Sequence, residues 1–381
     1  MSIIIPANSA VGGGFDVDNS VRYNGSSDSM NRTFAAGNQK TWTWSMWIKR
    51  SKLSVDQTLF GRMTSTGDAG WFNMSLNSDD TITFGIYNTS YRKTNRVFRD
   101  TSAWYHIVLA FDTTQGTAAN RIKFYINGVE ETSFSTSNDP SQNFDGPFNA
   151  NAVHSLGIQP IPGGYEKYYG GYISEVTFID GAANAVTDFG EFDDSGIWKP
   201  ISVSGLTFGT NGFYLPFTNS SALGEDYSGE DHDWTTVNLA AIDQSLDSCT
   251  NNFCTPNPLY PGSGVAFSEG NLKTVFTSYS QSPNGTIGAG AGKWYYEMKM
   301  SGTHARFGWC ESHCPQGDLD SNSTFPAYAI YSNGSSSLGL RVYKNVTTKA
   351  ITDNGGYTEW SAGNTVGIAF DIDNGKFYAH L

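Results

Sequence analysis

The sequence predicts an all-β protein, and three observations support this. Glycine is abundant, with 42 residues among 381, and aromatic residues make up 14% of the chain. This composition is typical of many turns between strands rich in aromatic side chains. Charged residues make up only 15% of the chain. No long run shows the apolar period of about 3.6 residues that an amphipathic helix requires. A chain of this length can form two or three domains, each with its own core.

The strongest strand signal lies between residues 104 and 128. β-Branched and aromatic residues dominate 104–112 and 121–126, with a polar loop between them and Asn127-Gly128 after them. Asn-Gly supplies the positive φ angles of a tight hairpin turn. Residues 366–380 repeat the pattern around Asn374-Gly375. The repetition predicts two domains built on similar principles.

The first domain is expected to span residues 15–199, after an N-terminal arm at 1–14 that becomes ordered only against a partner. In the strand at 41–50, alternation places Trp42, Trp44 and Met46 on one face and Ser45 and Trp47 on the other. Gly, Asn and Asp turns separate the strands, which favours an antiparallel sandwich of two sheets. The predicted strands are 20–24, 41–50, 58–61, 71–76, 81–86, 104–112, 121–126 and 170–181.

A connector is expected at 200–261 and a second β domain at 262–381. The connector is acidic and irregular but is predicted to be ordered, because Trp234, Leu239 and Ile242 can anchor it. The second domain has its clearest strands at 292–300, 305–309 and 337–343. The chain stops at Leu381 directly after a strand, so we expect the second domain to be truncated.

The formal net charge is −13. This charge argues against a nucleic-acid partner, because phosphate contacts require a basic face. The first six residues lack the basic and apolar regions of a signal peptide, and no segment is apolar for long enough to span a bilayer. We therefore expect a protein made in the cytoplasm, without membrane insertion.

Particular motifs resemble known families. The first domain resembles laminin-G-like, concanavalin A-like domains of bacteriophage proteins, through segments 19–23, 40–50, 104–108, 124–128 and 172–176. Segments 209–217, 226–229 and 250–253 resemble the connector that follows this domain in marine phage structural proteins. The C-terminal part resembles a SPRY domain through segments 292–297, 307–309 and 366–371. The connector of the family usually lacks cysteines, and a SPRY domain continues beyond residue 380, so the chain departs from the pattern at both places.

The resemblance implies two concanavalin A-like antiparallel β-sandwiches of the jelly-roll type, in series, with an ordered connector. It also implies a structural protein of a phage virion that acts as a fibre or appendage adhesin. Its partners would be other virion proteins, further copies of itself in a homo-oligomer such as a trimer, and a host-surface glycan or protein. The alternatives are an architectural head-decoration or tail component without a ligand, and a polysaccharide depolymerase.

The sequence predicts no catalytic residues and no enzymatic activity. Jelly-roll glycoside hydrolases carry two carboxylates on one strand in the pattern Glu-x-Asp-x-x-Glu. The nearest match begins at Glu191 and Asp193, but Gly196 replaces the second acid. His106 lies within a core strand and is expected to be a structural histidine.

Glycan binding would use aromatic rings on a loop. The glycine-flanked loop at 163–171 offers Tyr165, Tyr168 and Tyr169, and Trp360 is a further candidate in the second domain. The alternative is that these rings pack against a neighbouring subunit or the edge of the sandwich.

Calcium is a candidate cofactor, because lectin-like sandwiches often bind it with loop oxygens. The densest acidic cluster consists of Asp226, Glu230, Asp231 and Asp233. The alternative is a solvated acidic turn. No other cofactor is expected.

The cysteines form two local pairs, Cys249 with Cys254 and Cys310 with Cys314. Two short disulfides would fit an oxidising medium, and four free thiols a reducing one. The spacing does not fit the paired Cys-x₂-Cys units of structural zinc sites.

Overall fold

The computed structural model describes residues 14–64, 70–161, 163–259, 261, 264–276, 283–302, 304–310, 327–333, 341–344, 347–350 and 362–380. The described chain is almost entirely β, which confirms the predicted fold class. It contains strands and the short 3₁₀ helices η1 (Ala118–Asn120), η2 (Val186–Asp188) and η3 (Ala241–Asp243). The chain divides into two compact units, one running to Pro258 and including Phe267–Lys273, the other containing most of the chain from Leu259 onward. Each unit is described by itself.

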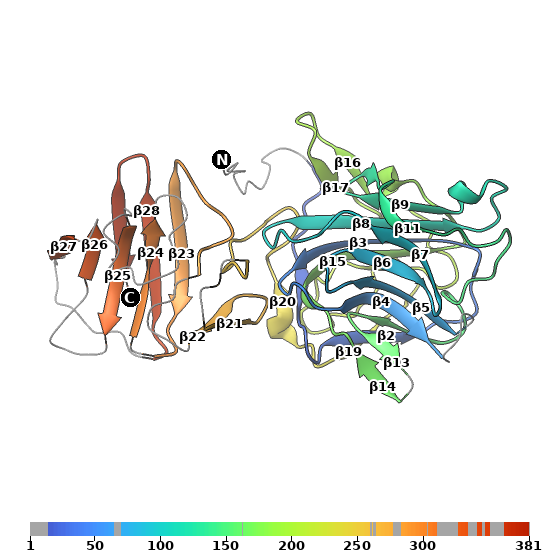
Figure 1. Ribbon diagram of the computed structural model, residues 1–381, viewed down its shortest axis with the longest axis horizontal. Coiled ribbons are helices and arrows are strands. Elements are labelled where there is room, and N and C mark those ends of the chain that lie inside the picture. Colours follow the sequence, from blue (N-terminus) through green and yellow to red (C-terminus); the bar gives the residue numbers. More distant parts are fainter. Residues whose placement is uncertain are drawn as a thin grey trace. The chain divides into compact units, whose positions relative to one another are not determined.

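The first unit is a sandwich of two antiparallel sheets (Figure 1). We call the first of them sheet A. Its order is β10 (Val129–Glu130), β9 (Ile122–Ile126), β8 (Trp104–Asp112), β3 (Thr41–Arg50), β15 (Gly170–Asp180), β1 (Ser20–Asn24) and β20 (Gln244–Ser245), with β18 (Phe213–Leu215) paired to β15.

The second sheet, sheet B, faces sheet A across the core. Its order is β11 (Phe134–Ser137), β7 (Thr89–Thr94), β6 (Ile82–Ile86), β5 (Trp71–Leu76), β4 (Gln57–Met63), β12 (Val153–Leu156), β2 (Ser29–Thr33) and β19 (Thr235–Val237). Two hairpins lie outside the sheets, β13 (Gln159–Ile161) with β14 (Gly164–Glu166), and β16 (Gly190–Phe192) with β17 (Trp198–Pro200).

The predicted hairpin is confirmed at the centre of sheet A. β8 pairs with β3 on one side and β9 on the other. Asn127 and Gly128 have φ angles of 49° and 78°, as a tight turn requires. In β3, Trp42, Trp44 and Met46 lie in the core between the sheets, as alternation predicts.

Every residue of β3 after Thr41 is buried, so its outward face is covered as well. Trp47, Trp104, Tyr172 and Trp198 form a cluster on that face. A second cluster there contains Val108, Ile179, Phe189, Val203 and Phe208. Many of the covering residues come from the chain after β15, and this chain therefore forms part of the first unit.

The connector is held by specific contacts. Trp234 lies in the sandwich core and Leu239 packs against it, whereas Ile242 is 80% exposed, so its prediction as an anchor was wrong. Lys49 of β3 donates from Nζ to Asp247 Oδ2 at 2.7 Å, and both side chains are buried. Trp104 Nε1 donates to Asp247 Oδ1 at 3.0 Å. A charge pair removed from water in this way fixes the connector to sheet A.

The second unit is also antiparallel where the structure describes it. One sheet has the order β23 (Lys293–Lys299), β28 (Thr365–Asp371) and β29 (Lys376–His380), and the other has β24 (His304–Cys310), β25 (Ala327–Asn333), β26 (Arg341–Lys344) and β27 (Thr347–Ala350). Trp309 and Phe370 bring the two sheets into contact, with ring centroids 4.8 Å apart. Among the described residues the remaining strands are β21 (Val265–Ser268) and β22 (Lys273–Phe276), whose residues are divided between the two units. No helix in the described parts of the chain is long and apolar enough to cross a membrane.

Candidate functional site

The outward face of sheet B is polar where the outward face of sheet A is apolar. In β5, Phe72 and Met74 point into the core, so the alternate residues Asn73 and Ser75 point outward. Thr83 of β6 pairs directly with Ser75 and extends the polar surface to the next strand. The face therefore carries short amide and hydroxyl side chains in register.

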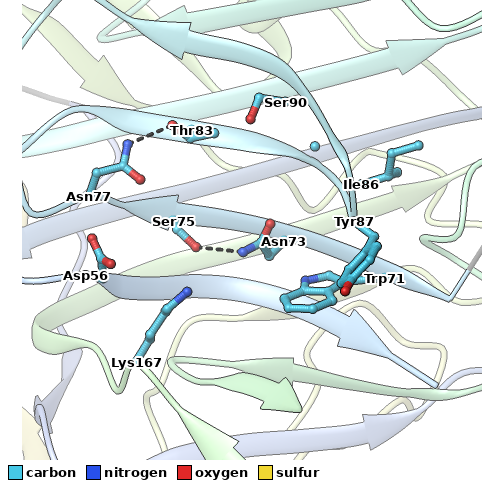
Figure 2. A pocket seen from close by; sticks show the side chains of 11 residues that line it. Asp56, Trp71, Asn73, Ser75, Asn77, Thr83, Ile86, Tyr87, Ser90 and Lys167 are labelled. Atoms are coloured by element: carbon cyan, nitrogen blue, oxygen red, sulfur yellow. Dashed lines mark hydrogen bonds between the residues drawn. The ribbon is translucent and has the colours of Figure 1, made fainter. Parts of the chain in front are cut away.

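A groove of about 290 Å³ lies on this face (Figure 2). This volume is close to the lower limit of small-molecule sites, which is about 300 Å³. The groove is lined by Asp56, Trp71, Asn73, Ser75, Asn77, Thr83, Gly85, Ile86, Tyr87, Ser90 and Lys167.

Two aromatic rings form one end of the groove. Trp71 begins β5 and Tyr87 lies in the turn between β6 and β7, and Figure 2 shows their rings beside each other. Their centroids are 5.1 Å apart and their planes are tilted by 41°. Tyr87 is 42% exposed. Exposed rings of this kind can cover the apolar C–H face of a sugar ring and still donate a hydrogen bond.

The floor of the groove offers unused acceptors. Asn73 Nδ2 donates to Ser75 Oγ at 3.0 Å, and Asn77 Nδ2 donates to Thr83 Oγ1 at 2.7 Å. Within the described residues, no donor reaches the Oδ1 atom of Asn73 or Asn77, so both amide oxygens can accept hydrogen bonds from a ligand. Both amides are held in place by the bonds that their nitrogens make.

Glycines keep the floor open beside Asn73. Its partners on the neighbouring strands are Gly61 of β4 and Gly85 of β6. A Cβ atom at Gly85 would collide with the carbonyl oxygen of Thr89. The strand β6 therefore requires glycine at this position, and the result is a depression with no side chain on either side of Asn73.

Charged groups form the other end of the groove. Asp56 Oδ1 accepts a hydrogen bond from the Ser78 amide at 2.7 Å. Lys167 follows β14 with a φ angle of 55°, and its carbonyl accepts from the Thr58 amide at 2.8 Å. Its Nζ lies 3.6 Å from Glu166 Oε1. Figure 2 shows Asp56 and Lys167 at the same end, away from Trp71.

The predicted tyrosine loop contributes to this groove, but not through its rings. Tyr165 is exposed in β14 and Tyr168 is half-buried. Tyr169 is fully buried, and its hydroxyl donates to the Lys49 carbonyl at 2.9 Å, so its prediction as a ligand-binding residue was wrong. Burial raises the pKa of the Tyr169 hydroxyl far above its usual value. Trp360 lies outside the described residues.

Two carboxylates of the acidic turn accept hydrogen bonds from backbone amides. Asp226 accepts hydrogen bonds from the backbone amides of Tyr214, Ser228 and His232, which occupy its carboxylate. Asp233 in turn accepts from the Asp226 amide. Among the described residues no group of three or more His, Cys, Asp or Glu side chains is placed to hold a metal ion. Calcium binding by Asp226, Glu230, Asp231 and Asp233 therefore stays a prediction from the sequence.

The cysteines of the connector are thiols in the structure. Cys249 packs beside the Trp47 cluster, and burial raises the pKa of its thiol well above its usual value. Cys254 is exposed. The reduced form does not test whether the pair closes in an oxidising medium. Cys310 is the last residue of β24, and Cys314 lies outside the described residues.

The carboxylates considered for hydrolysis lie on the β16–β17 hairpin. Glu191 is exposed, and Asp193 Oδ2 forms an ion pair with Lys199 Nζ at 2.7 Å. Asp193 Oδ1 accepts from the amides of Ser195 and Ile197, which fixes the turn.

The histidine of the central hairpin is structural, as predicted. His106 Nδ1 accepts from Trp198 Nε1 at 2.9 Å, so the proton of the neutral ring is on Nε2, which lies 2.8 Å from Ser45 Oγ. Burial lowers the pKa of His106 to about 3.

Comparisons with known proteins agree with the two-part organisation. Residues 24–186 match the family described as the concanavalin A-like lectin/glucanases superfamily, and residues 293–378 match the SPRY domain. The chain therefore contains a concanavalin A-like domain and a SPRY domain. No curated protein sequence matches the chain.

Solved structures with a similar fold come from several organisms. A heptameric SAP-like pentraxin from Limulus polyphemus is 19% identical, with 45% of this chain and 80% of that chain covered and a TM-score of 0.34. A putative carbohydrate-binding protein from Bacteroides ovatus is 14% identical, with coverage of 59% and 61% and a TM-score of 0.41. The CBM40 of the Ruminococcus gnavus IT-sialidase, bound to α2,3-sialyllactose, is 14% identical, with coverage of 44% and 92% and a TM-score of 0.31. At these TM-scores the likeness carries no argument about function.

Sequence reasoning missed most residues of the groove. The sequence does contain a pattern that indicates this surface. Trp71, Asn73 and Ser75 occupy the outward positions of a strand whose inward positions are all apolar. Asn77 and Thr83 continue the same polar surface beyond it. The candidate binding surface is an extended polar strand face and not a glycine-rich loop.

Proposed function

We propose that the first unit binds a short carbohydrate in the groove over β5 and β6. The observation that carries the proposal is the pair formed by the partly exposed ring of Trp71 and the exposed ring of Tyr87, beside the open amide oxygens of Asn73 and Asn77. A saccharide has apolar C–H faces for the rings and hydroxyl donors for the amide oxygens. The match to a family of lectins and glucanases supports a saccharide as the ligand class.

A glycan array followed by calorimetry tests the proposal. Trp71→Ala and Tyr87→Ala should each weaken binding by at least about tenfold, which corresponds to about 1.4 kcal/mol. Tyr165→Ala is the matched control, because Tyr165 is a similarly exposed ring that does not line the groove. The proposal fails if no glycan binds, or if the groove variants bind as tightly as the control.

We also propose that this binding is non-enzymatic and serves attachment. The sequence resemblance to phage structural proteins supports a fibre or appendage adhesin of a virion, with multiple copies that turn weak single contacts into firm attachment. In this role the chain would join other virion proteins. The alternative is an architectural component without a ligand, and location of the chain at the tail tip or over the head lattice distinguishes the two. Release of reducing sugar from host polysaccharide, lost in Glu191→Gln, would favour a depolymerase instead.

A further inference from the structure

The charges of the groove are balanced. Of the residues that line it, Asp56 and Lys167 carry charge, one of each sign, and they lie at the same end (Figure 2). Asp56 keeps Oδ2 available for a ligand, because its hydrogen bond from the Ser78 amide uses Oδ1. Lys167 has a carboxylate neighbour already, since Glu166 Oε1 lies 3.6 Å from its Nζ. The site therefore offers no surplus positive charge.

An anionic sugar would be poorly matched to this arrangement. A carboxylate or sulfate is best bound by cations that are not already paired, usually a bidentate arginine. Here the Nζ atom of the single lining lysine lies 3.6 Å from Glu166 Oε1, and the Asp56 carboxylate lies at the same end of the groove (Figure 2). The formal net charge of −13 also repels polyanions over long distances.

An uncharged sugar is well matched. Each hydroxyl group both donates and accepts, so two adjacent hydroxyls can donate to the Asp56 carboxylate and accept from the Lys167 ammonium. The floor then supplies acceptors at Asn73 and Asn77, and the rings at the far end cover the next part of the saccharide.

We infer that the groove selects an uncharged saccharide through the Asp56 carboxylate and the Lys167 ammonium, and that it discriminates against uronic acids, sialic acids and sulfated sugars. This inference rests on the proposed function of the groove. It adds the ligand class and names the two residues that determine it.

Matched pairs of neutral and acidic saccharides test the inference by calorimetry. The probes are galacto-oligosaccharides against oligogalacturonides of equal length, and lactose against 3′-sialyllactose. In at least one pair, the neutral member should bind at least about tenfold more tightly than its acidic partner. Because no net charge is involved, its affinity should change less than about twofold between about 20 mM and about 500 mM NaCl.

Two variants assign the selectivity to the charged end. Lys167→Met should weaken neutral binding by at least about fivefold, whereas Asp56→Asn should shift the preference toward the acidic member of each pair. Lys93→Met is the matched control for the lysine, because Lys93 is also about one-third exposed and paired, to Asp79, but does not line the groove. It should leave the affinity unchanged.

The outcomes separate the inference from the function on which it rests. Binding that is lost in Trp71→Ala but favours the acidic sugar would overturn the ligand class and leave the groove as the binding site. Equal effects of Lys167→Met and Lys93→Met would overturn the role of the charged end. Absence of any glycan binding would overturn both the proposed function and the inference.

Discussion

The two sheets of the first unit differ most on the faces that point away from the shared core. The outward face of sheet A is covered by the chain after β15 and carries Trp47, Trp104 and Tyr172. The outward face of sheet B carries Asn73, Ser75 and other short polar residues around a groove. One face is covered by the connector, whereas the other is open and carries the groove that we propose as the ligand site.

The electrostatics of the two faces differ in the same way. Beneath the connector, Lys49 and Asp247 form a pair with side chains only 1% and 4% exposed. On sheet B, Lys93 and Asp79 form a pair at a similar distance, but with side chains 35% and 51% exposed. Water screens the second pair and not the first, so only the first can contribute strongly to stability.

The largest effect is expected from Asp247→Ala. Removal of the carboxylate leaves the Lys49 ammonium buried without its counter-ion, which should destabilise the first unit by about 3–5 kcal/mol. Urea unfolding of the full chain, followed by tryptophan fluorescence, measures the change.

The matched control is Asp79→Ala. Loss of the exposed pair with Lys93 should change the unfolding free energy by less than about 1 kcal/mol. Similar losses in the two variants would mean that the connector does not seal sheet A from water, and the contrast between the faces would fail.

The sequence predicted the scaffold better than the site, for a physical reason. The alternation of Trp42, Trp44 and Met46 reports burial directly, and Asn127-Gly128 reports a turn directly. What covers an outward face depends on contacts between residues about 200 positions apart, such as Lys49 with Asp247. No local pattern encodes such a contact.

The same reason explains the errors at the site. Tyr165 and Tyr169 belong to the same glycine-flanked loop, yet the first is 48% exposed and the second is fully buried. Asp226 is surrounded by other acids in the sequence, yet its oxygens accept hydrogen bonds from backbone amides of its own turn and of β18. Composition identifies chemical groups, whereas only the fold shows which of them are free to act.

The stability of the first unit should depend on pH through Glu175, which lies in the irregular part of β15 that faces the connector. Its φ angle is 51°, and Oε2 accepts from the Tyr214 hydroxyl at 2.6 Å. Burial, and to a lesser extent the charge of Asp18, raises the pKa of Glu175 to about 7 from its ordinary value of 4.5. The folded state thus holds a proton that the unfolded state releases at lower pH.

Protonated Glu175 should therefore make its full contribution to the free energy of unfolding below about pH 4.5. This contribution should be lost as the pH rises to about 7, and the loss should be at most about 3 kcal/mol. Unfolding free energies of the natural chain and of Glu175→Gln, measured across this range, isolate the effect. The buried histidines His106 and His154, whose pKa values are lowered to about 3, act in the opposite direction but equally in both proteins. If the unfolding free energies of the two proteins change with pH in parallel, water reaches Glu175, and the connector does not shield this part of β15 from solvent.

The last pair of variants removes one hydroxyl group from the outward face of each sheet and compares the loss of stability. Ser45 is 2% exposed on sheet A, and its Oγ accepts a hydrogen bond from His106 Nε2. Ser45→Ala leaves this N–H group buried without an acceptor and should cost about 1–3 kcal/mol. Thr83→Val keeps the branched shape on sheet B but removes one of the two acceptors of Asn77 Nδ2, and Thr81 Oγ1 stays as the other. Water can replace that acceptor, so the cost should be about 0.5–1 kcal/mol.

Binding should respond in the reverse order, because Thr83 lines the groove and Ser45 does not. Calorimetry with the glycan found on the array should show weaker binding for Thr83→Val and unchanged binding for Ser45→Ala. If Ser45→Ala instead weakens binding and Thr83→Val does not, the ligand lies on sheet A, and the division between a covered scaffold face and an open binding face is wrong.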